Sequence, residues 1–228
     1  MNGPLAAFKW EALFRDWPTF ASGFGITIFV TILGLVLALV IGILLGIMST
    51  LRGKVPRGFS RAYVEFYQNT PLVIQVFFLY NGLPIAGIVL PVLVVGVLGV
   101  GMYHGAYVAE IIRAGIQSIT KGQMEAARSQ GFGHWAAMRW VVLPQAMRTV
   151  LPPLANQALF LVRNTSVLAM IAGGDLMYRA DSWSADTLYY GPAYIVTGVL
   201  YLIICYPLSR LARGLEARAS KSVQGAHA

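Results

Sequence analysis

A run of four polar residues interrupts a long apolar stretch of the chain: Arg163, Asn164, Thr165 and Ser166. A charged side chain in the middle of a membrane-length apolar segment costs at least about 2.5 to 3.5 kcal/mol, so it normally faces a bundle interior or a cavity. A guanidinium can donate two parallel hydrogen bonds to a carboxylate. We therefore predict that Arg163 binds a carboxylate, although an internal ion pair or a bond to a backbone carbonyl would also satisfy it. Four successive helical residues sweep about 300°, so not all of them can line one path.

Other polar residues in apolar surroundings are weaker candidates. His104 could relay protons, but a neutral histidine that is hydrogen-bonded within a helical bundle is the simpler interpretation. Glu110 and Arg113 have the spacing of an (i, i+3) pair, which favours a structural ion pair near a helix end. Tyr103 and Tyr107 are expected to serve in packing or at the membrane interface. None of these spacings indicates a metal site.

The chain lacks the glycine-rich loop G-x-x-x-x-G-K-[ST], with which many ATPases bind phosphates. We therefore expect no ATPase site, no catalytic residue and no bound cofactor on this chain. Any process driven by ATP would need another protein.

Composition identifies a membrane protein. Of the 228 residues, 57% are hydrophobic and 11% are charged, against about 25% charged in soluble domains. The net charge of +8 comes from short basic segments between apolar runs rather than from a basic stripe with stacking aromatic residues, which argues against nucleic acid as a partner. The single cysteine, Cys205, lies in an apolar run and is expected to be a small core residue.

Apolar runs of membrane length predict an all-α integral membrane bundle with five transmembrane helices. The expected spans are residues 22–51, 62–83, 88–113, 149–174 and 187–209, which form one domain, 22–209. Residues 1–21 are expected to lie at the membrane interface, because Trp10 and Trp17 suit that environment, and residues 210–228 are expected to form a tail.

Charge assigns the loops to the two sides of the membrane. The cluster of Arg52, Lys54, Arg57 and Arg61 contains no acid, and the segment 120–144 and the tail are also basic. The positive-inside rule therefore predicts that all three are cytoplasmic. The loop from Asp175 to Asp186 has three acids and one base, which suits the outer face. These assignments predict an outer N-terminus and a cytoplasmic C-terminus.

Small residues recur at every fourth position of the first expected span, at Gly34, Ala38, Gly42 and Gly46. Such a stripe lets helix backbones approach closely in lipid, where packing rather than hydrophobicity drives association. We predict a close helix contact along this stripe. The alternative is that glycine is simply common in membrane helices.

The segment 120–144, called the corner below, predicts two short helices joined by a turn. Thr120 and Gln123 have the spacing of a capping box, in which both side chains satisfy free backbone N–H groups at the start of a helix. Glu125 and Arg128 are predicted to pair on that helix.

Two glycines and a proline set the expected ends of the corner helices. The first helix is predicted to stop at Gly131 and Gly133, because glycine is a poor residue for a helix interior. The second is predicted to start near His134 and to end by Leu143, because Pro144 disfavours helical geometry in the residue before it.

The corner also carries a motif with fixed spacing. Glu125, Ala126 and Ala127 are followed by Gly131 and then by Leu143 and Pro144 in the pattern EAA-x3-G-x9-[IV]-x-LP. This pattern resembles the coupling motif in the membrane subunits of bacterial ATP-binding-cassette importers. The stretches 68–72, 105–116, 121–123, 143–146 and 163–167 resemble the polar amino acid permeases of that class, and the resemblance covers residues 27–206.

The resemblance implies a permease subunit whose cytoplasmic coupling helix docks on an ATPase dimer, with ATP and Mg on that partner. It also implies a second permease subunit of the same or homologous sequence, a periplasmic receptor that delivers a polar L-amino acid, and a multi-pass location in the bacterial cytoplasmic (inner) membrane. The coupling residues would be Glu125, Ala126, Ala127, Gly131, Leu143 and Pro144. The substrate path would include Arg163, Asn164, Thr165, Ser166, Asn69 and Thr70.

Two stretches depart from the family pattern. Gln68-Asn69-Thr70-Pro71 stands where Arg-Gly-Thr-Pro is usual, and Arg163-Asn164-Thr165-Ser166 stands where Lys-Asp-Thr-Ser is usual. The second departure removes an acid beside the cation, which favours an acidic or amide amino acid over a basic one. It could equally reflect a different partner subunit.

Two other hypotheses fit parts of the sequence. An ion-coupled secondary transporter could use Glu110, His104 and Arg163, but it would function without an ATPase and would be expected to show internal repeats. A scaffold subunit that transports nothing would show no substrate-dependent activity. Five spans without a clear repeat argue against the secondary transporter.

Overall fold

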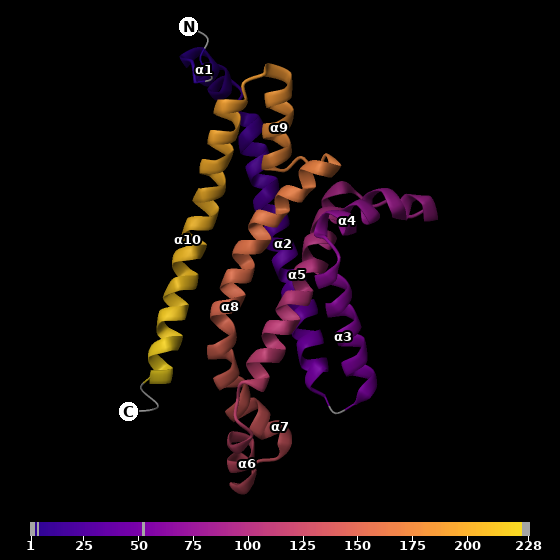
Figure 1. Cartoon of the computed structure of the whole chain (residues 1–228), viewed down its shortest axis with the longest axis vertical. Helices are drawn as coiled ribbons and strands as arrows, with labels where there is room; N and C mark the ends of the chain where they lie inside the picture. Colours follow the sequence, from indigo (N-terminus) through magenta and orange to yellow (C-terminus); the bar gives the residue numbers. More distant parts are fainter. Residues whose placement is uncertain (1–2, 4, 52, 225–228) are drawn as a thin grey trace.

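The computed structural model describes residue 3, residues 5–51 and residues 53–224. These residues form a helical membrane bundle with no β-strand among them, which confirms the predicted fold class. Four helices give the bundle its length: α2 (Trp17–Thr50), α5 (Val92–Gln117), α8 (Leu143–Asn164) and α10 (Tyr190–Gln224). Figure 1 shows them running along the long axis, with the two ends of the chain at opposite ends of the bundle.

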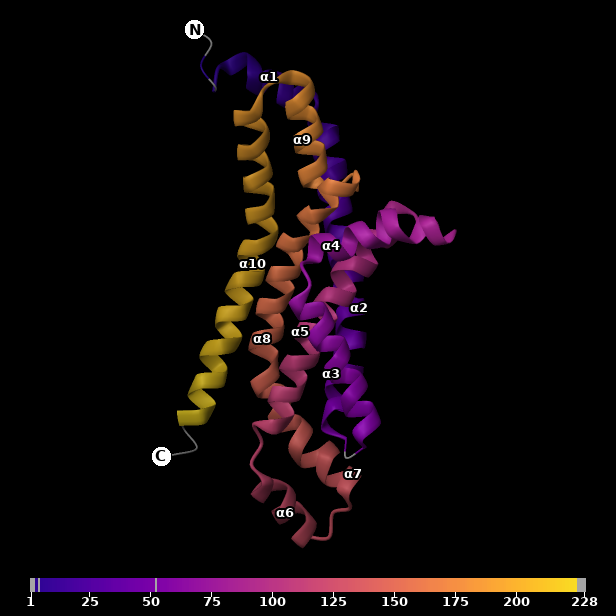
Figure 2. The same cartoon turned by 45° about the vertical axis from the view of Figure 1, so that its right-hand side comes forward.

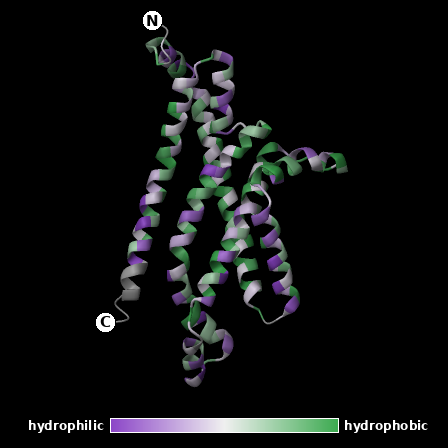
Figure 3. Cartoon of the chain, in the orientation of Figure 1, coloured by the Kyte–Doolittle hydropathy of each residue, from purple (hydrophilic) through white to green (hydrophobic). Residues whose placement is uncertain are grey.

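Shorter helices lie at the two ends of the bundle. One end holds α1 (Ala7–Arg15) and α9 (Leu176–Thr187), and the other holds α6 (Lys121–Ser129) and α7 (His134–Ala137), as Figure 1 shows. The second end is called the corner end below. Figure 3 shows hydrophobic residues along the middle of the long helices and more hydrophilic residues toward the corner end of α10. In Figure 1 the turn between α2 and α3, the helices α6 and α7 and the end of α10 lie at the corner end, so the basic segments of the sequence gather there.

The helices α2 and α5 pack backbone against backbone along the predicted stripe. All four small residues of the stripe are buried: Gly34, Ala38, Gly42 and Gly46. A Cβ atom added at Gly42 would lie 2.3 Å from Cγ1 of Val108 and 2.9 Å from the backbone nitrogen of Ala109. From the side of α5, a Cβ atom at Gly105 would lie 2.9 Å from Cγ2 of Ile41. Glycine on both helices thus permits an approach that larger side chains would prevent.

The expected span 62–83 is not a single helix. The helix α3 (Lys54–Asn69) lies against α2 and α5 and ends before Pro71, and a shorter helix α4 (Leu72–Phe77) follows. Proline causes this break, because it lacks a backbone N–H and forces the preceding Thr70 into an extended conformation with φ −114° and ψ 130°. Figures 1 and 2 show α4 turned away from the bundle axis.

Side-chain hydrogen bonds fasten this broken segment. Gln75 donates from Nε2 across the break to the backbone carbonyls of Tyr67 (3.1 Å) and Thr70 (2.9 Å). Ser60 donates to the carbonyl of Leu45 on α2 at 2.8 Å. After α4 the chain continues as a π-helix (Phe78–Gly82) and a 3-10 helix (Leu83–Ala86) before α5 begins. The turn that the sequence predicted before α5 is present. The earlier break at Pro71 was not predicted.

Among the described residues, four helical segments are long and apolar enough to cross a membrane: Trp17–Thr50, Val92–Gln117, His134–Ile171 and Tyr190–Arg218. They overlap the expected spans 22–51, 88–113, 149–174 and 187–209. The first begins earlier than expected because Pro18 suits the first turn of a helix. The broken segment is the remaining expected span, so the count of five and the orientation of the bundle stay predictions.

A buried acid organises the end of the bundle opposite the corner. The carboxylate of Asp175 is fully buried and accepts hydrogen bonds from the backbone N–H groups of Met177 (3.1 Å) and Tyr178 (3.4 Å), which caps α9. Burial raises the pKa of Asp175 to about 6, although these two hydrogen bonds act in the opposite direction. Thr27 of α2 accepts from the backbone N–H of Leu176 at 3.0 Å. The start of α9 is therefore tied to α2.

The close contact between α2 and α5 predicts that replacing glycine by alanine affects stability differently at two positions of α2. Gly42→Ala is expected to destabilise the bundle by about 1–3 kcal/mol, because the added methyl group overlaps Val108 and the backbone of α5. Gly25→Ala is the matched control on the same helix, since a Cβ atom there meets nothing within 4 Å. This control is expected to be neutral or stabilising by up to about 1 kcal/mol. Thermal unfolding in detergent measures both, and equal melting temperatures would contradict the close contact.

Candidate functional site

A cavity of about 220 Å³ lies between α5 and α8. Three residues of each helix line it: Tyr103, His104 and Tyr107 from α5, and Gln157, Phe160 and Asn164 from α8. Aromatic rings stand beside amide and imidazole groups there. A cavity of this composition suits a small polar molecule that also has some apolar surface. We call it the central cavity.

Helical spacing brings these side chains together. On α8, Gln157, Phe160 and Asn164 are three and four residues apart, which places them on one face of the helix. On α5, the hydroxyl groups of Tyr103 and Tyr107 are one turn apart and lie 3.0 Å from each other. The lining therefore comes from one face of each of two packed helices, and its geometry depends on how α5 and α8 meet.

His104 is the buried centre of this lining. Only 1% of its surface is exposed, and its Nδ1 lies 2.6 Å from the Gln157 amide while its Nε2 lies 3.1 Å from the Asn164 amide. A neutral imidazole has one donor and one acceptor. One amide must therefore present its N–H group to the ring and the other its oxygen. The expectation of a histidine that is hydrogen-bonded within the bundle is confirmed.

The predicted substrate-path residues separate in the structure. Asn164 lines the central cavity, but Arg163 and Ser166 line a different cavity that also borders α10. Thr165 is fully buried, and its hydroxyl donates to the backbone carbonyl of Val162 at 2.8 Å. The four residues thus point in several directions, as their helical spacing predicts.

The guanidinium group of Arg163 is held locally. Its Nε donates to the backbone carbonyl of Leu159 at 3.3 Å, and the group lies over the ring of Phe160, 4.8 Å from the ring centre. The bond to a backbone carbonyl is one of the alternatives that the sequence allowed. Among the described residues no carboxylate lies within ion-pair distance of Arg163.

Asn69 and Thr70 shape the chain at the break before α4 and do not line the central cavity. Asn69 donates from Nδ2 to the carbonyl of Glu65 at 2.7 Å, and the carbonyl of Thr70 accepts from Gln75. Both residues therefore have local partners within this chain.

The predicted pairing of Glu110 with Arg113 is confirmed. Arg113 donates from Nε to Oε2 of Glu110 at 2.9 Å and from Nη2 to Oε1. On α5, Glu110 follows Tyr103 of the central cavity by seven residues, so the pair lies nearer to the end of the helix that leads to the corner. The spacing thus predicts correctly that these two residues form an ion pair near a helix end.

Gln157 is the member of the central cavity that sequence reasoning missed. The sequence feature that could have identified it is its position in a mostly apolar stretch, seven residues before Asn164. Seven residues make about two helical turns, so the two amides lie on the same face. Tyr103 and Tyr107, expected in packing or at the interface, also line the cavity.

The corner is a helix, a tight turn and a second helix. The turn is closed by two backbone hydrogen bonds, from Gly131 N–H to the carbonyl of Arg128 (3.0 Å) and from Phe132 N–H to the carbonyl of Ala127 (3.1 Å). This is the Schellman arrangement, which needs a left-handed residue just after the helix. Gly131 supplies it with φ +88°, and a Cβ atom there would meet nothing within 4 Å. Backbone conformation therefore explains this glycine within the subunit.

Two predicted contacts at the start of the corner are wrong. Thr120 precedes α6 but makes no side-chain capping hydrogen bond. The amide oxygen of Gln123 accepts from Nε2 of Gln145 on α8 at 3.4 Å. The pair of Glu125 with Arg128 is also absent among the described residues. Arg128 instead lines a cavity of about 800 Å³ between the corner and the ends of α2 and α5.

The second corner helix does not end by Leu143, so this prediction is also wrong. It runs from α7 through a π-helix (Met138–Val142) directly into α8, with Pro144 in the first turn of α8. A π-helical turn shifts the hydrogen bonds by one residue, which accommodates the missing N–H of the proline. The corner is thereby continuous with a helix that lines the central cavity.

The corner presents apolar side chains outside the bundle. Trp135 is 75% exposed and Trp140 is 65% exposed, and Phe132 is also exposed. Glu125 and Ala126 are exposed on α6, whereas Ala127 is buried. Large apolar side chains at such exposure are typical of a surface that contacts another protein or a membrane.

Comparisons with known proteins find relatives along most of the chain. Residues 38–221 match the family described as binding-protein-dependent transport system inner membrane component. The probable glutamine ABC transporter permease protein GlnM of Bacillus subtilis (strain 168) is 50% identical over 161 residues, 71% of this chain and 74% of that protein. The glutamine transport system permease protein GlnP of Escherichia coli (strain K12) is 34% identical over 213 residues, 92% of this chain and 97% of that protein.

Solved structures of the same fold agree with this result. The structure titled "Crystal structure of an amino acid ABC transporter with histidines" contains a chain with a TM-score of 0.85 and 33% identity, covering 92% of this chain and 98% of that one. An inward-facing structure of the MetNI methionine ABC transporter has a TM-score of 0.61 at 17% identity, covering 87% of this chain and 94% of that one. The second likeness shows the fold alone.

The left-handed conformation at the corner predicts a local effect of Gly131→Ala. A non-glycine residue in this conformation costs about 1–2 kcal/mol, so the turn and the end of α6 should open more often. Gly122→Ala on the same helix is the control, because its Cβ meets nothing and its φ is ordinary. Hydrogen exchange of the corner amides measures the opening. Equal exchange at Phe132 in the two variants would contradict the role given to Gly131.

Proposed function

The chain belongs to the family of inner membrane components of binding-protein-dependent transport systems, and we propose that it is a permease subunit of an ATP-driven importer for a polar L-amino acid. In this proposal the chain forms the substrate path and hydrolyses nothing. A cytoplasmic ATPase dimer binds ATP and Mg, and a periplasmic receptor delivers the substrate. A second permease subunit of the same or homologous sequence completes the path. The complex lies in the bacterial cytoplasmic (inner) membrane as a multi-pass assembly.

The central cavity carries this proposal. Its volume of about 220 Å³ suits one small molecule, and it offers both donors and acceptors from neutral groups. The amides of Gln157 and Asn164 are held by His104, so their orientation is set before a substrate arrives. Such preorganised polar groups in an otherwise apolar bundle are typical of a translocation site.

An amide amino acid is the substrate we favour, and an acidic one comes second. The lining of the central cavity carries no carboxylate that could form an ion pair with a basic side chain. Asn164 stands where an aspartate is usual in the family that the sequence resembles, which removes a negative charge from this wall. The names of the relatives GlnM and GlnP, which refer to glutamine, support the same choice. Arg163 stays a proposed partner for a substrate carboxylate.

The corner is the proposed docking site for the ATPase. Glu125 and Ala126 face outward from α6, and Trp135 stands clear of the bundle beyond the turn at Gly131. Leu143 and Pro144 begin the helix that leads to the central cavity. A movement of the corner would therefore act directly on α8. This continuity supports a coupling role for the motif residues, Ala127 included, whose burial holds α6 in place.

Transport by the reconstituted complex tests the proposal. The chain, its ATPase and its receptor are placed in proteoliposomes, and ATP-dependent uptake of labelled glutamine, glutamate and arginine is measured. Asn164→Leu is expected to lower uptake of the preferred substrate by about tenfold, because one partly buried hydrogen-bonding group of the cavity is lost. Basal ATP hydrolysis should be unchanged, since the substitution is remote from the corner.

The control variant is Asn156→Leu. Asn156 lies on the same helix but bonds the exposed Glu216 at 2.7 Å and does not line the cavity. Its uptake should stay near that of the unchanged protein. Uptake that persists without an ATPase would favour an ion-coupled transporter, and full activity of Asn164→Leu would remove the central cavity from the path.

A further inference from the structure

One face of α5 is open and polar along its length from the central cavity to the corner end. Tyr103, Tyr107, Glu110, Ala114 and Gln117 follow one another at intervals of four and three residues. At about 100° per residue they lie within an arc of about 80°. All five are at least partly exposed, whereas the opposite face of the helix is buried against α2. A face with this many polar groups is unsuited to lipid and suits a path that contains water.

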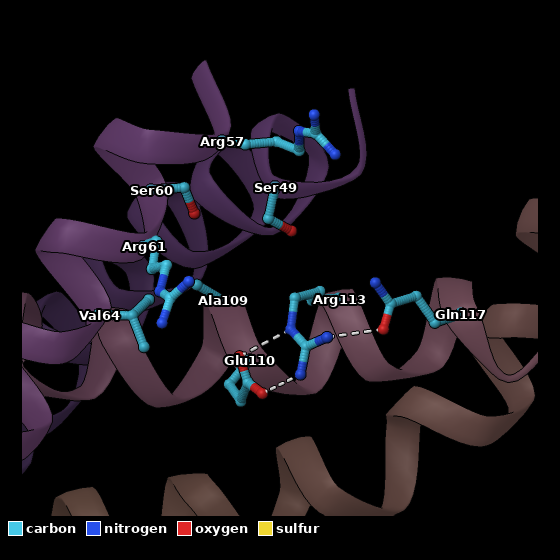
Figure 4. A pocket seen from close by; sticks show the side chains of 9 residues that line it. All are labelled: Ser49, Arg57, Ser60, Arg61, Val64, Ala109, Glu110, Arg113 and Gln117. Carbon is cyan, nitrogen blue, oxygen red and sulfur yellow. Dashed lines mark hydrogen bonds and ion pairs between the residues drawn. The ribbon is translucent and has the colours of Figure 1, made fainter. Parts of the chain in front are cut away.

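A second cavity opens on this face nearer the corner end. It has a volume of about 290 Å³ and lies between α3 and α5, beside the end of α2. Figure 4 shows Glu110, Arg113 and Gln117 on α5, with Arg57 and Arg61 on α3 at the other side. Glu110 follows Tyr103 of the central cavity by seven residues, or about 10 Å along the helix. We call this second cavity the exit cavity.

The exit cavity is lined by an ion pair, Glu110 with Arg113, that a charged ligand can open. Arg113 donates to both carboxylate oxygens of Glu110 and, from Nη1, to Oε1 of Gln117 at 2.6 Å. The side chains of Arg113 and Glu110 are 36% and 43% exposed. An ion pair at this exposure contributes little to stability, because water competes for both partners. A ligand with its own pair of charges can therefore replace each partner at small cost.

We propose that the exit cavity is a transit site for a zwitterionic amino acid on its way from the central cavity to the corner end. Arg113 binds the α-carboxylate of the ligand, and Glu110 binds its α-ammonium group. This inference rests on the proposed function and adds a second stop to the path. Each charge of the opened ion pair then has a partner of the opposite sign in the ligand.

The surroundings favour a zwitterion over a simple cation. Arg57 and Arg61 add positive charge on the α3 side. Arg61 pairs at 2.6 Å with Glu65, which lies outside the lining, so the groups around the cavity keep a net positive charge. The local field therefore attracts a carboxylate first. An anion without an ammonium group would leave the negative charge of Glu110 without a positive partner. A molecule with both charges on one carbon satisfies both ends of the opened pair.

Neutral substitutions separate a transit site from a structural ion pair. Uptake of labelled glutamine by the complex with ATPase and receptor is measured for Glu110→Gln, for Arg113→Gln and for the double variant. Each single variant is expected to lower uptake by about tenfold, as for the loss of one charge-assisted hydrogen bond. The double variant is expected to be as low as the lower single variant, because both contacts to the ligand are gone. A merely structural pair would show recovery in the double variant, where no unpaired charge is left, and that recovery would overturn the proposal.

Two further variants keep the result interpretable if the single variants assemble poorly. Gln117→Glu keeps the acceptor for Arg113 and adds a negative charge that competes with the substrate carboxylate, so uptake should fall while the amount of complex stays unchanged. Glu11→Gln is the control for Glu110→Gln, since it makes the same chemical change at an exposed position of α1, at the end of the bundle opposite the exit cavity, and its uptake should stay near normal. Normal uptake in Gln117→Glu would overturn the transit site. Absence of ATP-driven uptake in the unchanged complex would instead remove the proposed function, and the transit site with it.

Discussion

The backbone contact between α2 and α5 determines which side of α5 is left open. Gly42 and Gly105 bring the two helices so close that one face of α5 is closed to everything but α2. The remaining face carries tyrosines, an ion pair and a glutamine, which lipid would not tolerate at low cost. The small-residue stripe therefore does more than join two helices, since it fixes the rotation of α5 and turns its polar face toward α3 and α8.

The second structural constraint is that α8 belongs both to the corner and to the central cavity. The π-helical turn before Leu143 lets the helix continue past Pro144. Gln157 and Asn164 therefore lie on the same continuous helix that leaves the corner. At the other side, α5 runs from His104 directly to the start of the corner. Both helices that line the cavity thus end at the segment proposed to contact the ATPase, which is a short mechanical connection between the two.

Local patterns predicted the parts of this molecule that depend on local spacing. Gly42 in a four-residue repeat and Glu110 with Arg113 could be predicted, because helical periodicity alone decides which residues are neighbours. The break at Pro71 follows from a local rule about proline, although that rule alone does not decide between a kink and a break. The passage through Pro144 and the turning of Gln123 toward α8 could not be predicted, since the first depends on a shifted helical register and the second on a hydrogen bond to another segment. Gln157 was missed for the same reason, as its partner His104 lies on a different helix.

Thiol accessibility along α5 tests the central claim most directly. The single cysteine, Cys205, can be replaced by serine, and one cysteine at a time is then placed along α5 in the assembled complex. Our account predicts that a charged, water-soluble thiol reagent labels cysteines at Tyr103, Tyr107, Ala114 and Gln117. Cysteines at Ala106, Val108 and Ile112, which are buried, should stay unlabelled. Equal labelling of the two faces, or labelling of the open face by lipid-soluble reagents alone, would contradict the claim that this face lines a path containing water.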